Sequence, residues 1–205
     1  MSLLDDARLI IGRKGLKETM ARALLHPGIQ AIACYRVSHR LLLSGHGFLA
    51  RVVWRIGYQL SGASIEPGAE IGPDFHMDHP QGTLIYRNTR IGAGCQVFSN
   101  CSVGAAHAPN VTKIRDGAIV YHGARVGGNM TIGEYARIGV NTTVVRRDIP
   151  PYATVVGNPG KVIVIEGRKV DPADYEHYAY DPADYHGPPQ PGPDDLHLPD
   201  PPYCR

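Results

Sequence analysis

The chain of 205 residues lacks both a large net charge and a long block of basic residues. Its formal net charge is +2, and Lys and Arg never occur more than two in a row. Nucleic-acid binding depends on clustered positive charge, so we expect no nucleic-acid partner. No apolar stretch reaches the about 18 residues that a membrane-spanning helix needs, so we expect no membrane association.

Cysteine is scarce as well. The four cysteines have neither metal-type nor paired spacing, which favours reduced thiols: Cys34, Cys95, Cys101 and Cys204. Cys95 and Cys101 are six residues apart, which indicates packing rather than chemistry. The start of the chain, MSLLDDARLI, lacks the basic and apolar regions of a signal peptide, so we expect a cytoplasmic protein.

What the chain does have is a repeat of six residues. Ten of the twelve steps between successive members are six residues long in the series Ile65, Ile71, Met77, Ile85, Ile91, Val97, Val103, Ile114, Val120, Val126, Ile132, Ile138, Val144. A period of six gives three short flat faces per coil of about 18 residues, with each periodic side chain pointing inward. Gly, Asn and Asp cluster at the corners between faces. The pattern predicts a mainly β fold, a parallel β-helix of the hexapeptide type.

The regions on both sides of the repeat differ from it. Residues 1–62 are predicted to be α-helical, and a helix at 48–60 has an apolar side formed by Val52, Val53, Ile56 and Leu60. Such helices would cover the open end of the coil stack. The β-helix domain is expected at 63–165, with Pro150 and Pro151 stopping the coils and a terminal strand and turn at 152–164.

Residues 166–205 form a low-complexity tail rich in Pro, Asp and Tyr, in which DPADY occurs twice. It buries little aliphatic surface and is therefore expected to be disordered. The alternative is that its tyrosines wrap a neighbouring subunit.

The repeat is interrupted twice, and chemistry is expected at interruptions rather than in the packed coils. The first interruption contains Asp78-His79, and histidine is well suited to remove a proton near neutral pH, although a corner histidine can simply cap a turn. The second is a loop at 104–113 that contains His107, which either lines a pocket shared with His79 or is a solvated loop histidine. His76 and His79 have no clear third ligand, so no metal is expected.

With these elements in place, the chain resembles the serine acetyltransferase branch of the hexapeptide acyltransferases. The matching stretches are His26-Pro27-Gly28-Ile29, Tyr35-Arg36-Val37-Ser38-His39-Arg40-Leu41, residues 65–72, Asp78-His79, residues 148–151 and residues 155–163. The resemblance implies a left-handed β-helix, a homotrimer or a hexamer made of two trimers, and acetyl-CoA or another acyl-CoA as co-substrate. It also implies an active site between neighbouring subunits.

The resemblance assigns roles to individual residues. It implies that His79 is the general base, that Asp78 helps to hold the acceptor, and that transfer is direct, without a cysteine nucleophile. It places five residues beside the cofactor: Gly104, Ala105, His122, Arg137 and Val140.

The chain departs from the family pattern at several of these positions. Ser64 stands where the family has an aspartate that orients the base, and Glu66 is the candidate substitute. The Arg-His pair that grips the acceptor carboxylate is replaced by Asn110-Val111, and Arg87 lies in an altered run after the Asp-His turn. We therefore assign Asp78, His107, Asn110 and Arg87 to acceptor binding. The chain ends in Tyr203-Cys204-Arg205, so docking to cysteine synthase is not expected.

These observations predict an acyl-CoA-dependent O-acyltransferase that acts on the hydroxyl of a small molecule, with an acceptor other than free serine. Three alternatives stay open. They are serine O-acetyltransferase proper, an enzyme with an acyl-carrier-protein donor, suggested by the bulk of Tyr121-His122, and a non-catalytic or metal-binding β-helix assembly.

Overall fold

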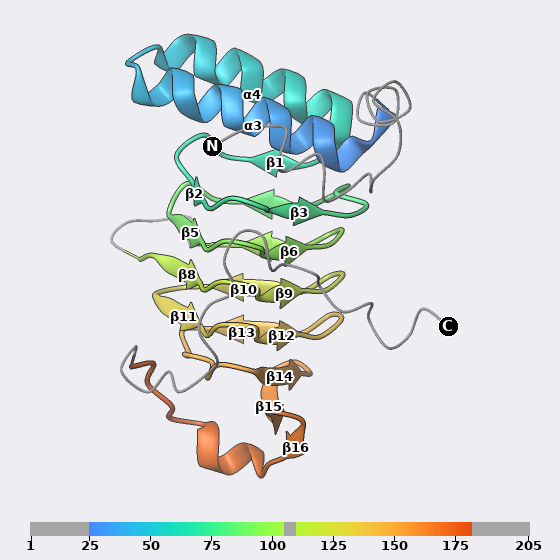
Figure 1. Cartoon of the computed structure of the whole chain (residues 1–205), viewed down its shortest axis with the longest axis vertical. Coiled ribbons are helices and arrows are strands. Elements are labelled where there is room, and N and C mark those ends of the chain that lie inside the picture. The colour runs from blue at the N-terminus through green and yellow to red at the C-terminus, as the bar shows by residue number, and fades with distance from the viewer. Residues whose placement is uncertain (1–24, 105–109, 182–205) are drawn as a thin grey trace.

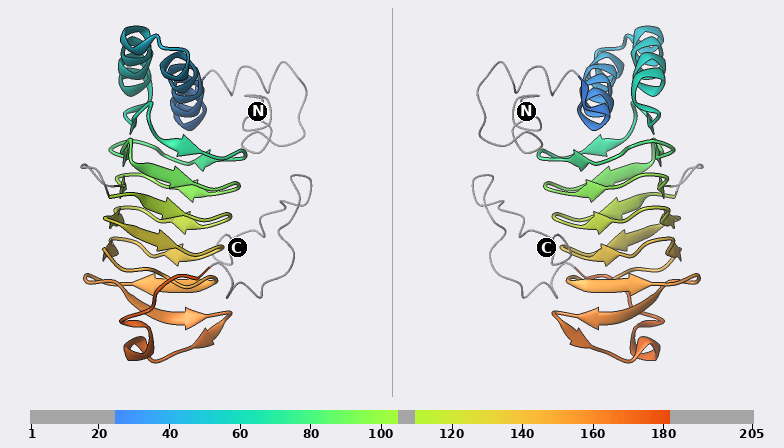
Figure 2. Two further views of the ribbon diagram at one scale, coloured as in Figure 1. Left: turned by 90° about the vertical axis from the view of Figure 1, so that its left-hand side faces the viewer. Right: turned by 90° about the vertical axis from the view of Figure 1, so that its right-hand side faces the viewer.

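A computed structural model of the chain describes residues 25–104 and 110–181. Two helices, α3 (Pro27–Leu43) and α4 (Gly47–Ser61), lie side by side across one end of a triangular stack of coils (Figure 1). Figure 2 shows the helices at one end of the stack and the C-terminal strands at the other.

Three sheets form the walls of the stack. Sheet A contains β1 (Ser64–Ile65), β4 (Leu84–Ile85), β7 (Ser102–Val103), β10 (Arg125–Gly127) and β13 (Thr143–Val145). Sheet B contains β2 (Glu70–Ile71), β5 (Thr89–Ile91), β8 (Thr112–Ile114) and β11 (Met130–Ile132). Sheet C contains β3 (His76–Met77), β6 (Gln96–Val97), β9 (Ile119–Val120), β12 (Arg137–Ile138), β14 (Ala153–Val156), β15 (Lys161–Ile165) and β16 (Arg168–Lys169).

The periodic residues form three inward columns, as the spacing predicts. Each coil pairs in parallel with the next, so that Ile85 lies beside Val103 in sheet A and Ile91 beside Ile114 in sheet B. All thirteen periodic side chains are buried. Full burial of one such side chain stabilises a fold by about 1.5–3 kcal/mol, so the columns are the main source of stability.

The expectation that Pro150 and Pro151 stop the coils is wrong. Ile149 is fully buried and bridges Ile132 in parallel, and β14 pairs in parallel with β12. The two prolines fall at the corner between sheets B and C, where their missing N–H groups interrupt no strand pairing. The stack therefore continues for a further part of a coil before β14 turns antiparallel into β15.

The helical cap binds the open end of the first coil through three side chains of α3. The Tyr35 hydroxyl donates to the carbonyl of Ala69 (2.7 Å), and the two Arg36 Nη atoms donate to the carbonyls of Ile71 and Gly72 (2.6 and 2.5 Å). His39 Nδ1 lies 2.7 Å from the carbonyl of Pro67. These carbonyls have no strand above them to donate, because β2 is the last strand of sheet B on that side. The Tyr35–Leu41 motif thus supplies hydrogen-bond partners to the backbone carbonyls at the open edge of the solenoid.

Arg36 is the strongest of these contacts, and replacing it by Met is expected to destabilise the protein by about 1–3 kcal/mol. Arg36 is buried, so the variant leaves two carbonyls without a charged donor. Urea unfolding followed by circular dichroism measures the change. Arg40→Met, on the exposed side of the same helix, is the control. Equal midpoints for the two variants would contradict the assigned role.

The apolar side predicted for the helix at 48–60 faces outward. Val52, Ile56 and Leu60 are 40%, 49% and 56% exposed, whereas Ala50 and Gly57 are buried. The small residues face inward because α4 crosses α3 too closely for larger ones: a Cβ on Gly57 would lie 2.6 Å from Cys34 Cβ. The exposed stripe therefore forms an apolar outer face of the cap.

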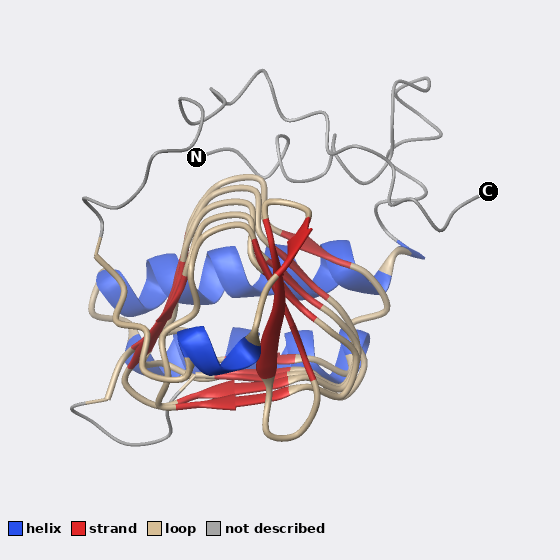
Figure 3. Ribbon diagram, turned by 90° about the horizontal axis from the view of Figure 1, so that it is seen from below, coloured by secondary structure: helices blue, strands red, loops and turns tan. Residues whose placement is uncertain are grey.

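The segment after β16 packs on its own chain as far as residue 181. A short helix, η1 (Pro172–Tyr175), lies across the open end of the stack (Figure 3). The Tyr180 hydroxyl donates to Glu134 Oε1 (2.5 Å), and its backbone N–H donates to Asp148 Oδ2 (3.0 Å). The prediction of disorder is wrong for this part of the tail, in which Tyr180 contacts its own chain. Residues 182–205 lie outside the described residues.

Candidate active site

Asp78 and His79 occupy the first interruption of the repeat, at the corner between sheets C and A. One residue with positive φ turns each coil at this corner, forming the column Gly62, Gly82, Asn100, Gly123 and Asn141. The two inserted residues give the first coil a second such residue, His79, at φ 49°. The imidazole consequently projects from the stack with 77% of its side chain exposed. It is poised to meet a ligand rather than to fill the interior.

The carboxylate of Asp78 lies between two imidazoles. Its Oδ1 atom is 3.9 Å from His79 Nε2 and also 3.9 Å from Nε2 of His26, which immediately precedes α3. Both distances are longer than a hydrogen bond and short enough for a charge interaction. A third imidazole, that of His76, lies on β3, where burial lowers its pKa and Asp78 partly opposes this effect. His26 was not identified from the sequence, although its motif was.

The next coils form a wall below Asp78-His79 at the same corner. The Phe98 ring stacks on Tyr121 (5.3 Å between centroids) and packs on His122 (4.7 Å). His122 Nδ1 lies 2.8 Å from Ser99 Oγ, so this imidazole is held in place. Val140, one coil further on, is 59% exposed, and Arg137 is exposed on β12. His122, Arg137 and Val140 thus lie along one edge of the molecule.

A second group of candidate residues lies at the corner between sheets A and B. Glu66 Oε2 accepts from Arg87 Nε (3.0 Å) and from the Arg87 backbone N–H (3.2 Å). Gly104 follows β7, and its N–H is bonded to the Val126 carbonyl (2.9 Å), so this N–H is not available to a ligand. Asn110, half-buried, leads into β8. Ala105 and His107 lie outside the described residues.

The two corners separate residues that the sequence analysis had grouped together. The loop at 104–113 joins sheet A to sheet B, whereas His79 joins sheet C to sheet A. The fold therefore does not bring this loop and His79 together in one pocket of a single chain. The carboxylate of Glu66 binds Arg87 and does not reach His79, which corrects the suggestion that Glu66 orients the base of its own chain. Ser64, half-buried, begins β1 on sheet A between the two corners.

The described cysteines, Cys34, Cys95 and Cys101, take no part in either group. Cys95 and Cys101 are fully buried, and burial raises the pKa of Cys95 to about 12. A thiol of this kind is not a nucleophile near neutral pH. In the described parts of the chain, no group of three His, Cys, Asp or Glu side chains could hold a metal ion, and no helix has the length and apolarity to cross a membrane.

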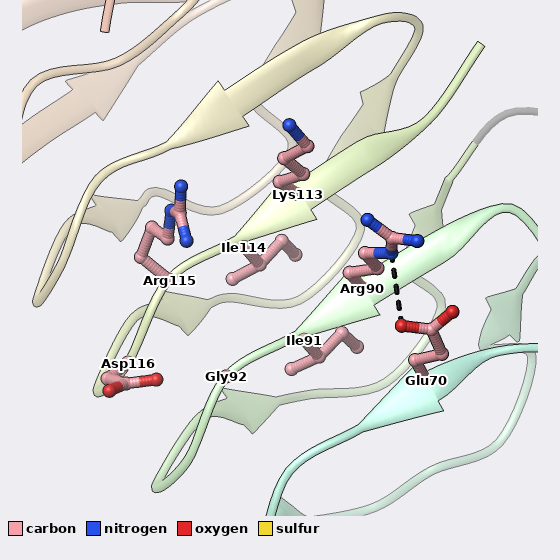
Figure 4. Close-up of a pocket in the computed structure, with 8 residues that line it drawn as sticks. All are labelled: Glu70, Arg90, Ile91, Gly92, Lys113, Ile114, Arg115 and Asp116. Atoms are coloured by element: carbon pink, nitrogen blue, oxygen red, sulfur yellow. Dashed lines mark ion pairs between the residues drawn. The ribbon is translucent and has the colours of Figure 1, made fainter. Parts of the chain in front are cut away.

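A groove of about 290 Å³ lies elsewhere, on sheet B (Figure 4). Glu70 pairs with Arg90 at 3.0 Å, and Lys113 and Arg115 continue the line of side chains along successive coils. None of the residues that line the groove belongs to the corner that carries His79. We place the candidate active site at Asp78-His79 because, in the described parts of the chain, this is where histidine side chains lie within 4 Å of a carboxylate, one of them 77% exposed.

Comparison with known proteins supports the family resemblance found in the sequence. No family model matches the chain. The serine acetyltransferase of Synechococcus elongatus is 34% identical over 178 residues, which cover 85% of this chain and 72% of the relative. The serine acetyltransferase of Bacillus subtilis is 37% identical over 150 residues, 72% of this chain and 69% of the relative. The chain belongs to the serine acetyltransferase family.

Solved structures of this family have the same fold. Serine acetyltransferase from Neisseria gonorrhoeae, in complex with serine, aligns with a TM-score of 0.71 at 29% identity, covering 79% of this chain and 67% of that one. The enzyme from Brucella abortus, in complex with coenzyme A, aligns with a TM-score of 0.71 at 24% identity, covering 78% and 66%. The predicted left-handed β-helix with a helical cap is thus confirmed, as is the predicted enzyme class, acyltransferase. The chain spans about two thirds of these structures.

Proposed function

We propose that this member of the serine acetyltransferase family transfers an acetyl group from acetyl-CoA to the hydroxyl of a small acceptor, with His79 as general base. One observation carries the proposal: the insertion at the corner between sheets C and A holds an exposed imidazole 3.9 Å from a carboxylate. The relatives named serine acetyltransferase and the coenzyme A complex of the Brucella abortus protein support the donor.

The proposed chemistry is a direct transfer. His79 accepts the hydroxyl proton while the hydroxyl oxygen attacks the thioester carbonyl carbon. The new C–O bond forms, the C–S bond breaks, and the departing CoA thiolate takes the proton from the imidazolium. Asp78 stabilises the positive charge that develops on His79, as a carboxylate does for a catalytic imidazolium. No cysteine is needed as a nucleophile, in agreement with the burial of Cys95 and Cys101.

The donor is proposed to lie along the edge below His79. His122, Arg137 and Val140 lie on the later coils of that edge, with Arg137 able to pair with a phosphate of CoA. The Gly104 carbonyl and Ala105 would contact the pantetheine from the other corner. This assignment needs two copies of the chain, because one copy does not bring the two corners together.

A homotrimer would satisfy this requirement, and we propose that each active site lies between two subunits. The corner with Asp78-His79 would come from one subunit, and the corner with Arg87, Asn110 and the loop that holds His107 from the next. The exposed apolar stripe of the cap is the candidate surface for pairing trimers into hexamers. The division at 62 and 165 and the cytoplasmic location stay predictions, as does the lack of cysteine synthase docking.

The acceptor is the least constrained part of the proposal. Serine is the acceptor named by the relatives and the ligand of the Neisseria gonorrhoeae structure. Asn110 and Val111 lack the positive charge needed to grip a free carboxylate, which favours an acceptor without one. We therefore propose serine as the first acceptor to assay and an uncharged hydroxyl compound as the second.

The test is an acceptor panel. Purified protein is incubated with acetyl-CoA and, separately, L-serine or an uncharged hydroxyl compound (a set of neutral sugars and alcohols), and products are identified by mass. Acetylation of any hydroxyl compound supports the proposal, and its identity decides between the two acceptor classes. Transfer only from an acetylated carrier protein would move the assignment to that donor. No transfer from either donor, together with stoichiometric bound zinc, would replace it by a metal-binding assembly.

A further inference from the structure

His26 is an N-terminal cap residue that does not cap its helix. Cap positions favour Ser, Thr, Asp and Asn, because their side chains accept from the first free N–H groups of the helix. The His26 side chain makes no such bond to α3, and Pro27 starts the helix without an N–H group. The imidazole instead packs beside Gly28 in the first turn of α3, with Nε2 on the side of Asp78 in the turn that follows β3.

Close packing holds this imidazole against the candidate active site. A Cβ on Gly28 would lie 2.0 Å from the Met77 carbonyl oxygen, so the start of α3 lies directly on the backbone that leads into Asp78. His26 is only 31% exposed, and its Nδ1 atom is buried without a hydrogen-bond partner. The other ring nitrogen, Nε2, is 3.9 Å from Asp78 Oδ1. In the part of the chain that the structure describes, Asp78 is thus the carboxylate that His26 meets.

Asp78 needs such a partner, because it lies on an exposed corner. Its side chain is 38% exposed, and within the described residues Oδ1 makes its ion contacts, to His26 and His79. A free aspartate at a corner samples several rotamers, and fixing one of them costs conformational entropy each time a substrate binds. His26, held by the helix, restricts the carboxylate in advance. In the described part of the chain, His76 also lies near Asp78, and burial lowers the pKa of its imidazole.

We propose that His26 is a positioning residue for acetyl transfer: it fixes the Asp78 carboxylate so that one face of Oδ1 meets the His79 imidazole. This inference rests on the proposed function and assigns the helical cap a part in it. The cap then has two roles. Tyr35 and Arg36 donate hydrogen bonds to carbonyls of the first coil, and His26 restricts the rotamers of the Asp78 carboxylate. An orienting partner for the Asp78–His79 pair thus comes from α3, whereas Ser64 occupies the position that the sequence analysis had considered for one.

Three variants test the inference. His26→Leu keeps an apolar side chain of similar size and removes both ring nitrogens, and His26→Gln keeps a polar N–H group that can reach the position of Nε2. His46→Leu is the matched control, because His46 is the cap residue of α4, also makes no cap bond, and is exposed. We expect His26→Leu to lower kcat roughly 10-fold or more while the KM for acetyl-CoA and the Tm change little. His26→Gln should recover most of kcat, and His46→Leu should match the wild-type protein.

A second measurement does not require activity. The ¹³C signal of the Asp78 carboxyl carbon at one fixed pH should move in His26→Leu and stay near its wild-type position in His26→Gln and His46→Leu. Equal kcat in all four proteins, or equal loss in both His26 variants, would overturn the inference. So would an unmoved Asp78 signal in His26→Leu. An inactive wild-type protein with a moved Asp78 signal would instead overturn the proposed function alone.

Discussion

His79→Asn is expected to lower kcat for acetyl transfer by about 10²–10⁴-fold, with little change in the KM for acetyl-CoA. The variant removes the group proposed to accept the hydroxyl proton, while the rest of the corner is kept. Loss of kcat at constant KM is the signature of an interaction that acts in the transition state. Steady-state kinetics with the acceptor found in the panel measures both values.

Asparagine is the right replacement because of the backbone at this position. His79 has φ 49°, a left-handed conformation that Asn adopts more readily than Ala does. Asn also forms the same corner one coil later, at Asn100 with φ 55°. The variant should therefore unfold at the wild-type temperature, which separates lost chemistry from lost structure.

His46→Asn serves as the control for a histidine that lies far from the corner, at the start of α4. It should keep wild-type kcat. If His79→Asn also keeps wild-type kcat, the base is elsewhere, and the insertion at this corner serves the fold alone. His122 is then the next imidazole to examine, because it lies on the same edge and is already held by Ser99.

The coils could be predicted from the sequence because their geometry is local. A branched side chain at every sixth position fixes the inward direction of each face, and Val97, Val120 and Ile138 follow this rule in one column of sheet C. The partial coil after Val144 was missed because the step to Ile149 is five residues and two prolines follow. The prolines lie at a corner, where the rule against proline in a sheet does not apply.

The placement of the two interruptions was within reach of the sequence. Counting three faces per coil from Ile65 puts Met77 on the third face and Val103 on the first, so the insertions after them fall at different corners. The spacing in coils alone suggested that His79 and the loop with His107 lie near each other. The number of coils between two residues gives their separation along the stack axis. The face count shows at which of the three corners each residue lies.

The contacts of the cap could not be predicted, because they join residues far apart in the chain. Tyr35 and Ala69 are 34 residues apart, and no local pattern states which carbonyl a helix side chain meets. The same holds for His26 and Asp78, which were both recognised within motifs and whose proximity appears only in the fold. Glu66 was matched to the wrong partner for the same reason. Alternation along a strand shows which side of the strand a side chain is on, but not which residue it contacts there.

Gly28→Ala is expected to destabilise the protein by about 3 kcal/mol and to lower acetyl transfer as well. The new Cβ would lie 2.0 Å from the Met77 carbonyl oxygen, a backbone atom that cannot rotate away as a flexible side chain could. Either α3 or β3 must shift. A shift of α3 weakens the hydrogen bonds of Arg36 to the first coil, and a shift of β3 moves Asp78, the residue after Met77.

Gly47→Ala is the matched control, because Gly47 is also in the first turn of a helix and a Cβ there would meet nothing within 4 Å. Its unfolding free energy should rise slightly, by about 0.5–1 kcal/mol, since alanine restricts the unfolded chain more than glycine does. Urea unfolding of both variants, with kcat measured below the transition, separates the two effects. If Gly28→Ala is as stable as Gly47→Ala, the cap does not rest on β3, and both the packing of α3 and the role of His26 lose their structural basis.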